Sequence, residues 1–417
     1  MSTNKDIKPL SQQENILWNS AGSLVNLIAQ WGISILIVQL SSGFDAAGLY
    51  SLAVTVYNIF APIGQYRMYT YQISDVNREN TTGEYFSFRI ITGLGALLLC
   101  YGYALLTCPS HSFSTIACFG FYKFIELLID VLHARCQRNG RLDYVGISLA
   151  AQGIASLSVF SVSFLLTQSI VLAILLMTIA IACVGLFFTL PRSLLFGEIH
   201  LGITRQKAFR LLLLALPFVI SSITSSAALS LPRQELFRQY GDAMLGIYGS
   251  VAAPVAIIPT AASYVYYPLI GEFADLYDRR QFSSFLLLML KVLVAMLALG
   301  FFFSIVLGFV GGPLLDFVFG NGAGDYAYLL QPLIINAIIS AFAWFENDLL
   351  IALRNHLGPL LSGGLSLVSS LFSAPYFVQL FGSNGVSYTC IAAGLVAIIT
   401  MTLFIVFQLR KMNTATV

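Results

Sequence analysis

Residues 283–309 read S-S-F-L-L-L-M-L-K-V-L-V-A-M-L-A-L-G-F-F-F-S-I-V-L-G-F and carry one charged side chain, that of Lys291. A helix needs about 20 apolar residues to cross the hydrocarbon layer of a membrane, because lipid cannot hydrogen-bond to exposed backbone groups. This run is therefore long enough to span a membrane. The whole chain agrees, since 58% of its 417 residues are hydrophobic and 10% are charged, outside the range of soluble globular domains.

Apolar runs of this kind recur along the chain and predict an all-α polytopic membrane protein with about twelve transmembrane helices. The other eleven runs fall at residues 15–40, 46–71, 86–107, 112–134, 143–166, 168–190, 208–231, 243–270, 326–353, 358–380 and 385–409. The polar start of the chain leads into the first run with no small-residue cleavage site. We therefore expect the first helix, and not a cleaved signal peptide, to direct insertion.

Basic residues gather at alternate ends of these runs, as they do where Lys-rich and Arg-rich loops stay in the cytoplasm. Those on the expected cytoplasmic side are Lys5, Lys8, Arg78, Arg89, Arg135, Arg138, Arg141, Arg192, Arg205, Lys207, Arg210, Arg279, Arg280, Arg354, Arg410 and Lys411. On the opposite side only Arg233 and Arg238 break the pattern. We expect a multi-pass protein of the bacterial inner membrane with both termini in the cytoplasm.

Two short motifs occur twice, in the same order. D-A-A-G-L-Y-S from Asp45 resembles D-A-M-L-G-I-Y-G from Asp242, and F-I-E-L-L-I-D-V-L-H-A-R around Glu126 resembles W-F-E-N-D-L-L-I-A-L-R around Glu346. Six spans separate the copies, so both would keep one orientation and be related by a pseudo-two-fold axis along the membrane normal. The sequence therefore predicts two six-helix bundles, over residues 1–195 and 196–417, with a transport cavity between them.

Polar side chains form a stripe along the fourth expected span. Its members, three or four residues apart and hence on one helical face, are Lys123, Glu126, Asp130, His133 and Gln137. An ionisable group at membrane depth costs roughly 2.5–3.5 kcal/mol, so such groups face a partner or a wet cavity. Lys123 and Glu126 could also simply neutralise each other as an i,i+3 pair. Four ionisable groups on one face favour the cavity.

Further polar residues lie in the first, second and tenth spans. The candidates for a substrate cavity are Asn26, Gln30, Asn58, Gln65, Arg67 and Asn347, and Glu346 and Asp348 flank the last of these. The alternative is that the amides only hold helices together, because Asn and Gln hydrogen-bond across helix interfaces in membranes. Both interpretations remain open for the amides taken singly.

Three more basic residues lie where positive charge is unusual. Lys291, inside an apolar span, needs an acidic partner or an anionic substrate. Arg233 and Arg238 fall in what we expect to be a short external turn after the seventh span. There they could be neutralised by Glu235 and Asp242, or they could attract an anion, and the sequence does not separate these two roles.

Catalytic patterns are missing from the sequence. It contains no P-loop, its four histidines have no zinc-site spacing, and its six cysteines show neither disulfide nor metal spacing. The formal net charge of +2 is spread thinly, which argues against a nucleic-acid partner. We expect a protein that is not an enzyme and has no metal site and no cofactor.

Three motifs carry a resemblance to a known family. They are L-P-R-Q-E-L-F-R-Q-Y-G-D-A-M-L-G-I-Y-G-S at residues 231–250, Y-P-L-I-G-E-F-A-D-L-Y-D-R-R-Q-F at 267–282 and D-A-A-G-L-Y-S at 45–51. With twelve spans in two halves, the chain resembles the Wzx-like polysaccharide exporters of the multidrug/oligosaccharidyl-lipid/polysaccharide superfamily. The resemblance implies a MATE/MurJ-like fold. It also implies a flippase that moves an undecaprenyl-linked oligosaccharide from the inner to the outer leaflet for O-antigen, capsule or exopolysaccharide biosynthesis.

A flippase of this kind would bind the diphosphate of its substrate through basic residues. The candidates are Arg67, Lys123, Arg233, Arg238 and Lys291, with the amides above for the sugars. Transport would be coupled to an ion and would work by alternating access, and the candidates for coupling to H⁺ or Na⁺ are Glu126, Asp130, Glu346 and Asp348. The expected partners are the lipid-linked oligosaccharide, membrane lipids and a polysaccharide polymerase.

Two other functions remain open at this point. A cation-coupled drug or metabolite exporter of the same superfamily would bind cationic substrates through acidic residues and would need fewer basic ones. A membrane-embedded polysaccharide polymerase or ligase would use paired carboxylates such as Glu126 and Asp130, although no large external loop exists to hold an acceptor.

Overall fold

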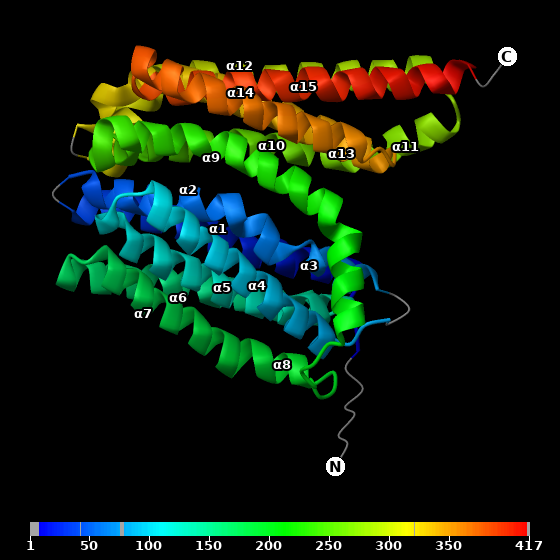
Figure 1. The fold of residues 1–417 in the computed structure, drawn as a ribbon, viewed down its shortest axis with the longest axis horizontal. Coiled ribbons are helices and arrows are strands. Elements are labelled where there is room, and N and C mark those ends of the chain that lie inside the picture. Colours follow the sequence, from blue (N-terminus) through cyan, green and yellow to red (C-terminus); the bar gives the residue numbers. More distant parts are fainter. Residues whose placement is uncertain (1–7, 42, 76–78, 321, 415–417) are drawn as a thin grey trace. The chain divides into compact units, whose positions relative to one another are not determined.

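The computed structural model describes residues 8–41, 43–75, 79–320 and 322–414, and it contains helices and turns with no strand in those ranges (Figure 1). The all-α fold expected from the sequence is confirmed. The chain forms two compact units: unit 1 comprises residues 1–42 and 52–219, and unit 2 comprises residues 43–51 and 220–417.

Unit 1 is a bundle of long helices connected by short turns. Its helices are α1 (Gln12–Leu40), α2 (Asp45–Gln65), whose residues 45–51 belong to unit 2, α3 (Met68–Ser74), α4 (Thr82–Thr107), α5 (Ser110–Arg138), α6 (Leu142–Thr167), α7 (Ile170–Val184) and α8 (Leu190–Leu194). Helix α6 packs along α1 and α7, and α5 packs along α4 and α7. Capping boxes start two helices, Ser11 with Glu14 at α1 and Thr81 with Glu84 at α4, so these helix starts are set by local sequence.

Glycines let α1 and α6 approach closely in unit 1. A Cβ atom on Gly22 would lie 2.1 Å from the carbonyl oxygen of Gly146, and one on Gly146 would lie 2.1 Å from that of Trp18. No other residue fits at these two positions without separating the helices. Small residues at helix crossings are typical of membrane bundles, where close packing replaces the hydrophobic effect between helices.

Unit 2 contains the remaining long helices. They are α9 (Arg205–Val255), which begins in unit 1, α10 (Ile257–Tyr266), α11 (Ile270–Asp278), α12 (Phe282–Phe319), α13 (Leu330–Ala352), α14 (Leu357–Phe381) and α15 (Ser383–Thr414). Helix α15 packs against α13 and α14, and α13 also contacts α10 and α12. Aromatic rings of Tyr266, Phe273 and Phe345 meet in its core.

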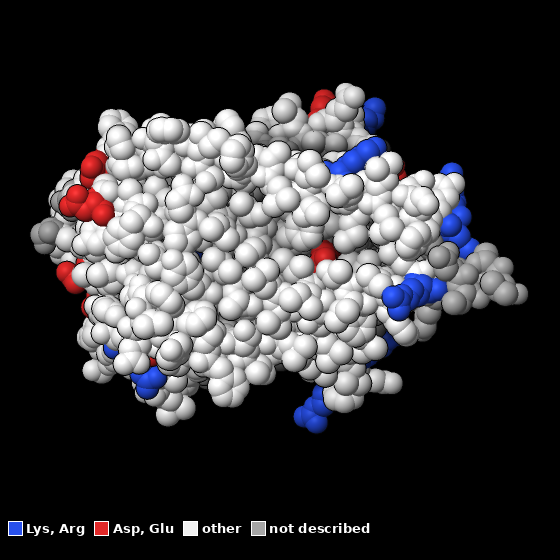
Figure 2. All heavy atoms as spheres, turned by 90° about the horizontal axis from the view of Figure 1, so that it is seen from above, with Lys and Arg blue, Asp and Glu red and all other residues white. Residues whose placement is uncertain are grey.

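Large apolar side chains cover much of the outer surface. Leu98, Leu106, Phe309 and Phe372 are 73%, 88%, 84% and 81% exposed. On the face drawn in Figure 2, most Lys and Arg atoms lie toward the right of the view and a smaller group lies at the lower left, and the broad surface between them is almost free of charge. A soluble protein does not expose apolar surface of this extent, whereas a lipid-facing one must.

Ten helical segments of the described chain are long and apolar enough to cross a membrane. One of them, residues 205–278, is 74 residues long and contains both the seventh and the eighth expected spans. Helix α5 is not among the ten because its polar stripe lowers its hydropathy, but it runs for 29 residues beside α4 and α7. Counting the long segment twice and adding α5 recovers the expected twelve spans.

The prediction of a short external turn around Arg233 and Arg238 was wrong. Both residues lie inside α9, which leaves helical geometry only at Gly241, where φ is 82° and ψ is −175°. Helical spacing continues past Pro232 because Leu236 and Phe237 are buried in unit 2. A single glycine makes the reversal, since it alone adopts this backbone conformation without strain.

The α1–α6 crossing gives a direct stability prediction. We expect Gly146→Ala to lower stability by about 1–3 kcal/mol, as overpacking does, because the new methyl group meets a backbone oxygen that cannot move aside. Gly95→Ala is the matched control, since its Cβ would meet nothing within 4 Å. Thermal unfolding of the purified variants in detergent measures both, and equal melting temperatures would show that the crossing tolerates a side chain.

Candidate functional site

A polar cavity of about 570 Å³ lies inside unit 1. Helices α1 to α6 all contribute side chains to it. The lining residues are Asn26, Gln30, Tyr57, Asn58, Ala61, Gln65, Arg67, Tyr69, Thr70, Arg89, Lys123, Glu126, Leu127, Asp130, His133, Leu149 and Gln152. The structure thus brings together nine of the polar residues that the sequence places within the expected spans: Asn26, Gln30, Asn58, Gln65, Arg67, Lys123, Glu126, Asp130 and His133.

A break between α2 and α3 forms one wall of the cavity. Helix α2 contains Pro62 and ends at Gln65, and the next two residues, Tyr66 and Arg67, have positive φ angles of 42° and 53°. Residues other than glycine rarely adopt a positive φ angle, so surrounding contacts must hold the backbone in this conformation. The hydroxyl of Tyr66 donates to the carbonyl of Leu212 at 3.0 Å, which is one such contact.

Arg89 of α4 supplies further contacts that hold the break between α2 and α3. Its side chain is 1% exposed, and its Nη1 donates to the carbonyl oxygens of Gly64, at 3.2 Å, and of Gln65. The break in the helix leaves these two carbonyls without their usual partners. Nη2 of the same guanidinium forms an ion pair of 2.9 Å with Oδ2 of Asp130 on α5. One side chain therefore satisfies the broken helix and fixes an acidic group at the cavity wall.

A second ion pair lies on the same face of α5. Nζ of Lys123 is 2.6 Å from Oε2 of Glu126, and the hydroxyl of Tyr122 donates to Oε1 of Glu126 at 2.8 Å. The i,i+3 pairing considered from the sequence is therefore present, yet both side chains also line the cavity. The two side chains keep 23% and 24% of their surface exposed, so their charges remain accessible to a ligand.

A hydrogen-bonded chain continues behind His133. Its Nε2 lies 2.9 Å from Oγ of Ser148, which lies 2.7 Å from Oγ1 of Thr189 and accepts from Nε2 of Gln152 at 3.0 Å. Ser148 and Thr189 are buried, so this chain reaches from the cavity wall into the bundle. The tautomer of His133 decides the direction of the first bond.

Arg67 is the cation of the cavity that is least engaged by protein groups. It forms no ion pair with a described residue, and its guanidinium carbon lies 5.4 Å from the centre of the Phe218 ring. A cation–π contact leaves the N–H groups at the edge of the guanidinium free to bind an acceptor.

The other predicted site residues lie in unit 2. Lys291 is exposed on α12, and Arg238 is exposed on α9, where it forms a 3.8 Å ion pair with Glu235. Arg233 lies with its guanidinium carbon 5.9 Å from the centre of the Tyr248 ring. None of them lines the unit 1 cavity, and their role in substrate binding stays a prediction.

The acidic cluster of the tenth span also belongs to unit 2. Glu346 on α13 is completely buried, accepts a 2.7 Å hydrogen bond from Thr402, and leaves Oε2 without a partner. Asp348 accepts from the hydroxyl of Tyr266 at 3.1 Å and from the amide of Asn347 at 3.3 Å. Glu346 thus contacts α15, and Asp348 contacts α10.

Sequence reasoning missed Arg89, which it placed with the cytoplasmic loop charges. That assignment was wrong, because Arg89 is two turns into α4 and points into the bundle. The spacing contained the signal: Tyr85, Arg89, Thr92 and Ala96 lie on one face, and all four are buried. Tyr57 and Gln152 were also missed, and they line the cavity from α2 and α6.

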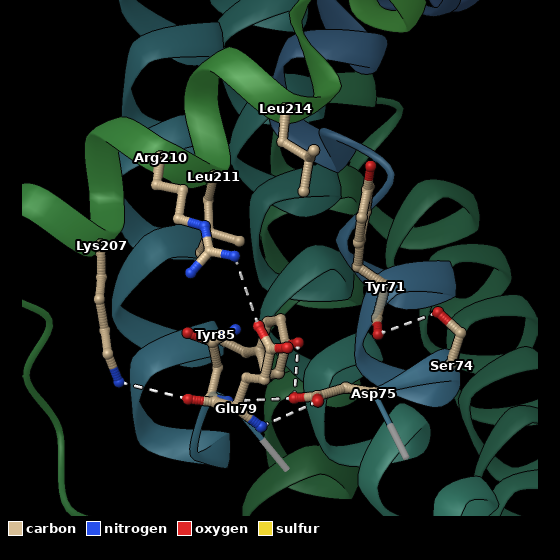
Figure 3. A pocket seen from close by; sticks show the side chains of 10 residues that line it. Tyr71, Ser74, Asp75, Glu79, Tyr85, Lys207, Arg210, Leu211 and Leu214 are labelled. Carbon is tan, nitrogen blue, oxygen red and sulfur yellow. Dashed lines mark hydrogen bonds and ion pairs between the residues drawn. The ribbon is translucent and has the colours of Figure 1, made fainter. Parts of the chain in front are cut away.

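A second polar pocket, of about 260 Å³, lies where the first turns of α9 meet the end of α3 (Figure 3). Nζ of Lys207 lies 2.7 Å from Oε1 of Glu84, and Nη2 of Arg210 lies 3.7 Å from Oε2 of Glu79. These pairs attach the start of α9 to the α3–α4 connection. They are partly exposed, so each contributes little to stability by itself.

Asp75 is the acceptor at the centre of that connection. Burial alone would raise the pKa of its carboxyl. The backbone N–H groups of Asn80 and Glu79 and the hydroxyl of Tyr85 donate to it, Arg138 lies 4.0 Å away, and together these hold the pKa below its ordinary value. Hydrogen bonds to the charged form have this effect.

Comparisons with known proteins agree with the resemblance found in the sequence. No family model matches the chain. The capsular polysaccharide biosynthesis protein CapF of Staphylococcus aureus is 24% identical to it over 328 residues, 76% of this chain and 80% of that protein. The resemblance to polysaccharide biosynthesis proteins noted in the sequence is thereby confirmed.

Solved structures with the same fold are transporters and flippases. The lipid II flippase MurJ, in an inward closed conformation, matches with a TM-score of 0.74 at 11% identity, over 96% of this chain and 90% of that one. An inward-facing multidrug resistance MATE family transporter of the MOP superfamily matches with a TM-score of 0.72 at 12% identity, over 97% and 100%. The expected MATE/MurJ-like fold is confirmed.

The Arg89–Asp130 pair gives the second prediction. Breaking a buried ion pair costs about 3–5 kcal/mol, and we expect about 3 kcal/mol for Arg89→Met because Asp130 is 36% exposed toward the cavity. The carbonyl of Gln65 also loses its donor, whereas that of Gly64 keeps a 3.1 Å hydrogen bond from the hydroxyl of Thr92. Asp130→Asn should cost less, since the amide oxygen still accepts. A loss no larger than that of the surface variant Arg205→Gln, measured by thermal unfolding, would contradict this account.

Asp75 gives a pH-dependent prediction. A carboxyl whose pKa is lowered by folding stabilises the protein above its unfolded pKa, about 3.9, and the stabilisation is lost as the pH falls through the lower folded pKa. Asp75→Asn should therefore melt at a lower temperature than the unsubstituted protein at pH 7. The difference should narrow below about pH 4. A difference that is the same at pH 7 and pH 3 would show that Asp75 is not stabilised as a carboxylate.

Proposed function

We propose that this chain, which has the fold shared by MATE transporters and MurJ, translocates an undecaprenyl-(di)phosphate-linked oligosaccharide repeat unit. Transport would run from the cytoplasmic to the outer leaflet and serve surface polysaccharide biosynthesis. The observation that carries the proposal is the unit 1 cavity, which combines three cationic side chains with amides and tyrosine hydroxyls inside an apolar bundle. The CapF resemblance supports the link to polysaccharide biosynthesis.

The chemistry of such a substrate matches the lining. Each hydroxyl or phosphate oxygen would cost roughly 2–7 kcal/mol in hydrocarbon without a partner, so a flippase must offer polar groups along the path. Arg67 and Lys123 present cations to a diphosphate, and Arg67 can bind it through two parallel N–H groups. Asn26, Gln30 and Asn58 offer both donors and acceptors to sugar hydroxyls.

Charge balance in the cavity favours an anionic substrate. Its lining carries Arg67, Arg89 and Lys123 against Glu126 and Asp130, three positive charges and two negative ones. Both carboxylates are already paired, at 2.6 Å and 2.9 Å, whereas Arg67 is not. A cationic drug would find no unpaired carboxylate in this cavity, which argues against the drug exporter.

Coupling to an ion is part of the proposal. Glu126 and Asp130 in unit 1, and Glu346 and Asp348 in unit 2, are the candidate carriers of H⁺ or Na⁺. Glu346 is the best placed by its surroundings, because a completely buried carboxyl with one oxygen unpartnered calls for a proton or a cation. An inside-negative membrane potential would also favour expulsion of an anion, by about 2.3 kcal/mol per charge per 100 mV.

The proposal places the protein in the inner membrane with both termini in the cytoplasm. The end of unit 1 that carries Lys207, Arg210, Arg135 and Arg138 would then face the cytoplasm, as basic residues normally do. Membrane lipids and a polysaccharide polymerase would be its neighbours. The chain itself would perform no covalent chemistry.

Substitution in the cavity tests the proposal. In cells that depend on this chain, we expect Arg67→Gln and Lys123→Gln each to reduce surface polysaccharide at least about tenfold, because a charge-assisted hydrogen bond to phosphate is worth about 1.5–3 kcal/mol. Lipid-linked repeat units should accumulate on the cytoplasmic side. Arg205→Gln is the control, since it removes the same charge from an exposed position outside the cavity.

Three results would count against the proposal. Normal surface polysaccharide in both cavity variants, at normal protein levels, would remove the diphosphate from the cavity. Efflux of a cationic dye that requires Glu126 or Asp130 would favour the drug exporter. Elongation of a lipid-linked glycan by the purified protein, with no membrane gradient, would favour a polymerase.

A further inference from the structure

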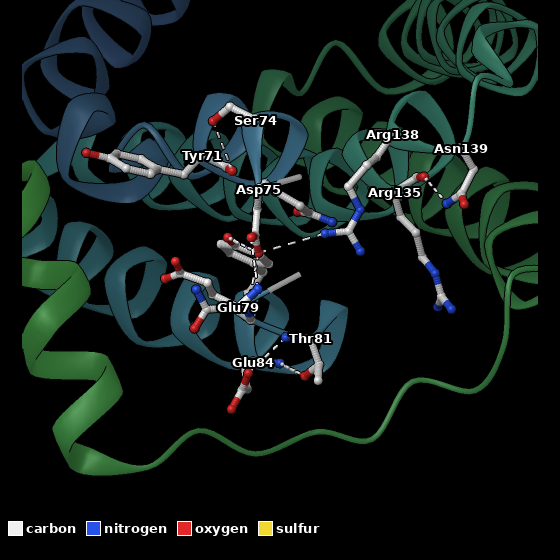
Figure 4. Close-up of polar contacts among 12 residues, drawn as sticks. Tyr71, Ser74, Asp75, Glu79, Thr81, Glu84, Arg135, Arg138 and Asn139 are labelled. Atoms are coloured by element: carbon white, nitrogen blue, oxygen red, sulfur yellow. Dashed lines mark hydrogen bonds and ion pairs between the residues drawn. The ribbon is translucent and has the colours of Figure 1, made fainter. Parts of the chain in front are cut away.

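Two arginines at the end of α5 line a third cavity in unit 1, of about 260 Å³. Its walls are the last turn of α5, with Arg135 and Arg138, the first turn of α4, and the segment 196–200 that follows α8 (Figure 4). This segment lies directly on α4, because a Cβ on Gly83 would be 1.8 Å from the carbonyl oxygen of His200. The cavity shares no lining residue with the 570 Å³ cavity.

Arg135 is buried and only partly satisfied. It is 6% exposed, and its Nη2 donates to the carbonyl oxygens of Phe196 and Gly197, both at 2.9 Å. These two bonds anchor the segment, which is the structural role of the residue. They leave Nη1 buried with no hydrogen-bond partner. A buried charged donor without a partner costs free energy, so its presence points to an acceptor that binds there.

Arg138 adds a second incomplete guanidinium. Its Nε and Nη1 are buried without hydrogen-bond partners, and the nearest carboxylate oxygen, Oδ2 of Asp75, is 4.0 Å from Nη1. Figure 4 shows both side chains descending from the end of α5, with Arg138 directed toward Asp75 and Arg135 directed to the other side. Planar guanidinium groups with unused N–H donors match the oxygens of a phosphate better than they match any neutral ligand.

The first turn of α4 adds to the same electrostatic field. The Thr81–Glu84 capping box already satisfies part of this helix start, and the positive end of the helix dipole favours an anion. Glu198 is the one acidic residue that lines the cavity, and its side chain is 86% exposed. The charged groups that face inward are therefore the two arginines.

We propose that this cavity binds a phosphate group. The ligand is a phosphate ester, either the headgroup of an anionic phospholipid or a soluble phosphate compound. Its oxygens accept from Nη1 of Arg135 and from Nε and Nη1 of Arg138. Binding holds the segment 196–200 against α4 and α5 and so stabilises unit 1. This site is separate from the transport cavity, and it does not depend on the proposed function.

The test measures binding to the purified full-length chain and does not use glycan export. In one arm, inorganic phosphate is titrated into protein in a neutral detergent at constant ionic strength, with chloride as the balancing anion. In the other, nanodiscs of phosphatidylglycerol are compared with nanodiscs of phosphatidylcholine. The readout is the melting temperature, followed by the apparent Kd of the phosphate or lipid that raises it.

We expect the melting temperature of the unsubstituted protein to rise in at least one arm. Arg138→Gln should weaken that binding at least about tenfold, the loss expected when a charge-assisted pair is removed. Arg138→Lys keeps the charge near Asp75 but lacks the planar fork, and should weaken binding by less. Arg205→Gln removes one charge from an exposed position outside the cavity and should bind as the unsubstituted protein does.

Each outcome either identifies the source of the phosphate group or contradicts the proposed site. An effect of phosphatidylglycerol alone identifies a lipid headgroup, and an effect of inorganic phosphate identifies a soluble phosphate compound. No rise in either arm would overturn the proposal. So would an equal loss of binding in Arg205→Gln and Arg138→Gln, because the effect would then reflect general surface charge. If Arg138→Gln does not fold, Arg138→Lys against Arg205→Gln makes the same decision.

Discussion

The buried guanidinium of Arg89 is the interaction on which the unit 1 cavity depends. An arginine that is 1% exposed inside an apolar bundle needs partners for its charge, and here Nη1 and Nη2 donate to the carbonyls of Gly64 and Gln65 and to the carboxylate of Asp130, while Nε has no hydrogen-bond partner. The carbonyl oxygens at the break between α2 and α3 need hydrogen-bond donors, and the buried guanidinium of Arg89 needs acceptors. Because the break turns Arg67 toward the cavity, one buried pair sets the positions of two charges at once.

This arrangement separates charges that hold the structure from charges that can meet a ligand. Arg89 and Asp130 are used internally, and Lys123 and Glu126 pair within one helix. Arg67 rests on an aromatic ring and retains its N–H groups. A substrate with a diphosphate could bind Arg67 without first breaking a protein ion pair, and could then exchange with Lys123, whose partner is on the same helix. Weak, sequential binding of this kind suits a substrate that must also leave.

Sequence periodicity predicted the helices and most of the unit 1 cavity. The polar stripe on α5 could be recognised because ionisable residues three and four apart in an apolar run lie on one helical face. At membrane depth such a face must meet a partner or a wet cavity. Arg89 was missed because a basic residue near a helix start also satisfies the rule for cytoplasmic loops, and only the burial of its neighbours shows its direction. From the sequence, the turn was predicted several residues before Gly241. A single glycine that ends a helical stretch of 36 residues leaves no polar loop that the sequence could reveal. Tertiary contacts determine both the direction of the Arg89 side chain and the position of the helix break at Gly241. Sequence patterns do not contain these contacts.

The central claim is that the unit 1 cavity binds the diphosphate of a lipid-linked glycan. Equilibrium binding of undecaprenyl diphosphate to the purified full-length chain tests it most directly, with Arg67→Gln/Lys123→Gln compared with Arg205→Gln. The account predicts saturable binding to the unsubstituted protein and to Arg205→Gln, and a loss of at least about a hundredfold in the double variant, since two charge-assisted contacts are removed. Equal affinity in all three proteins would contradict it.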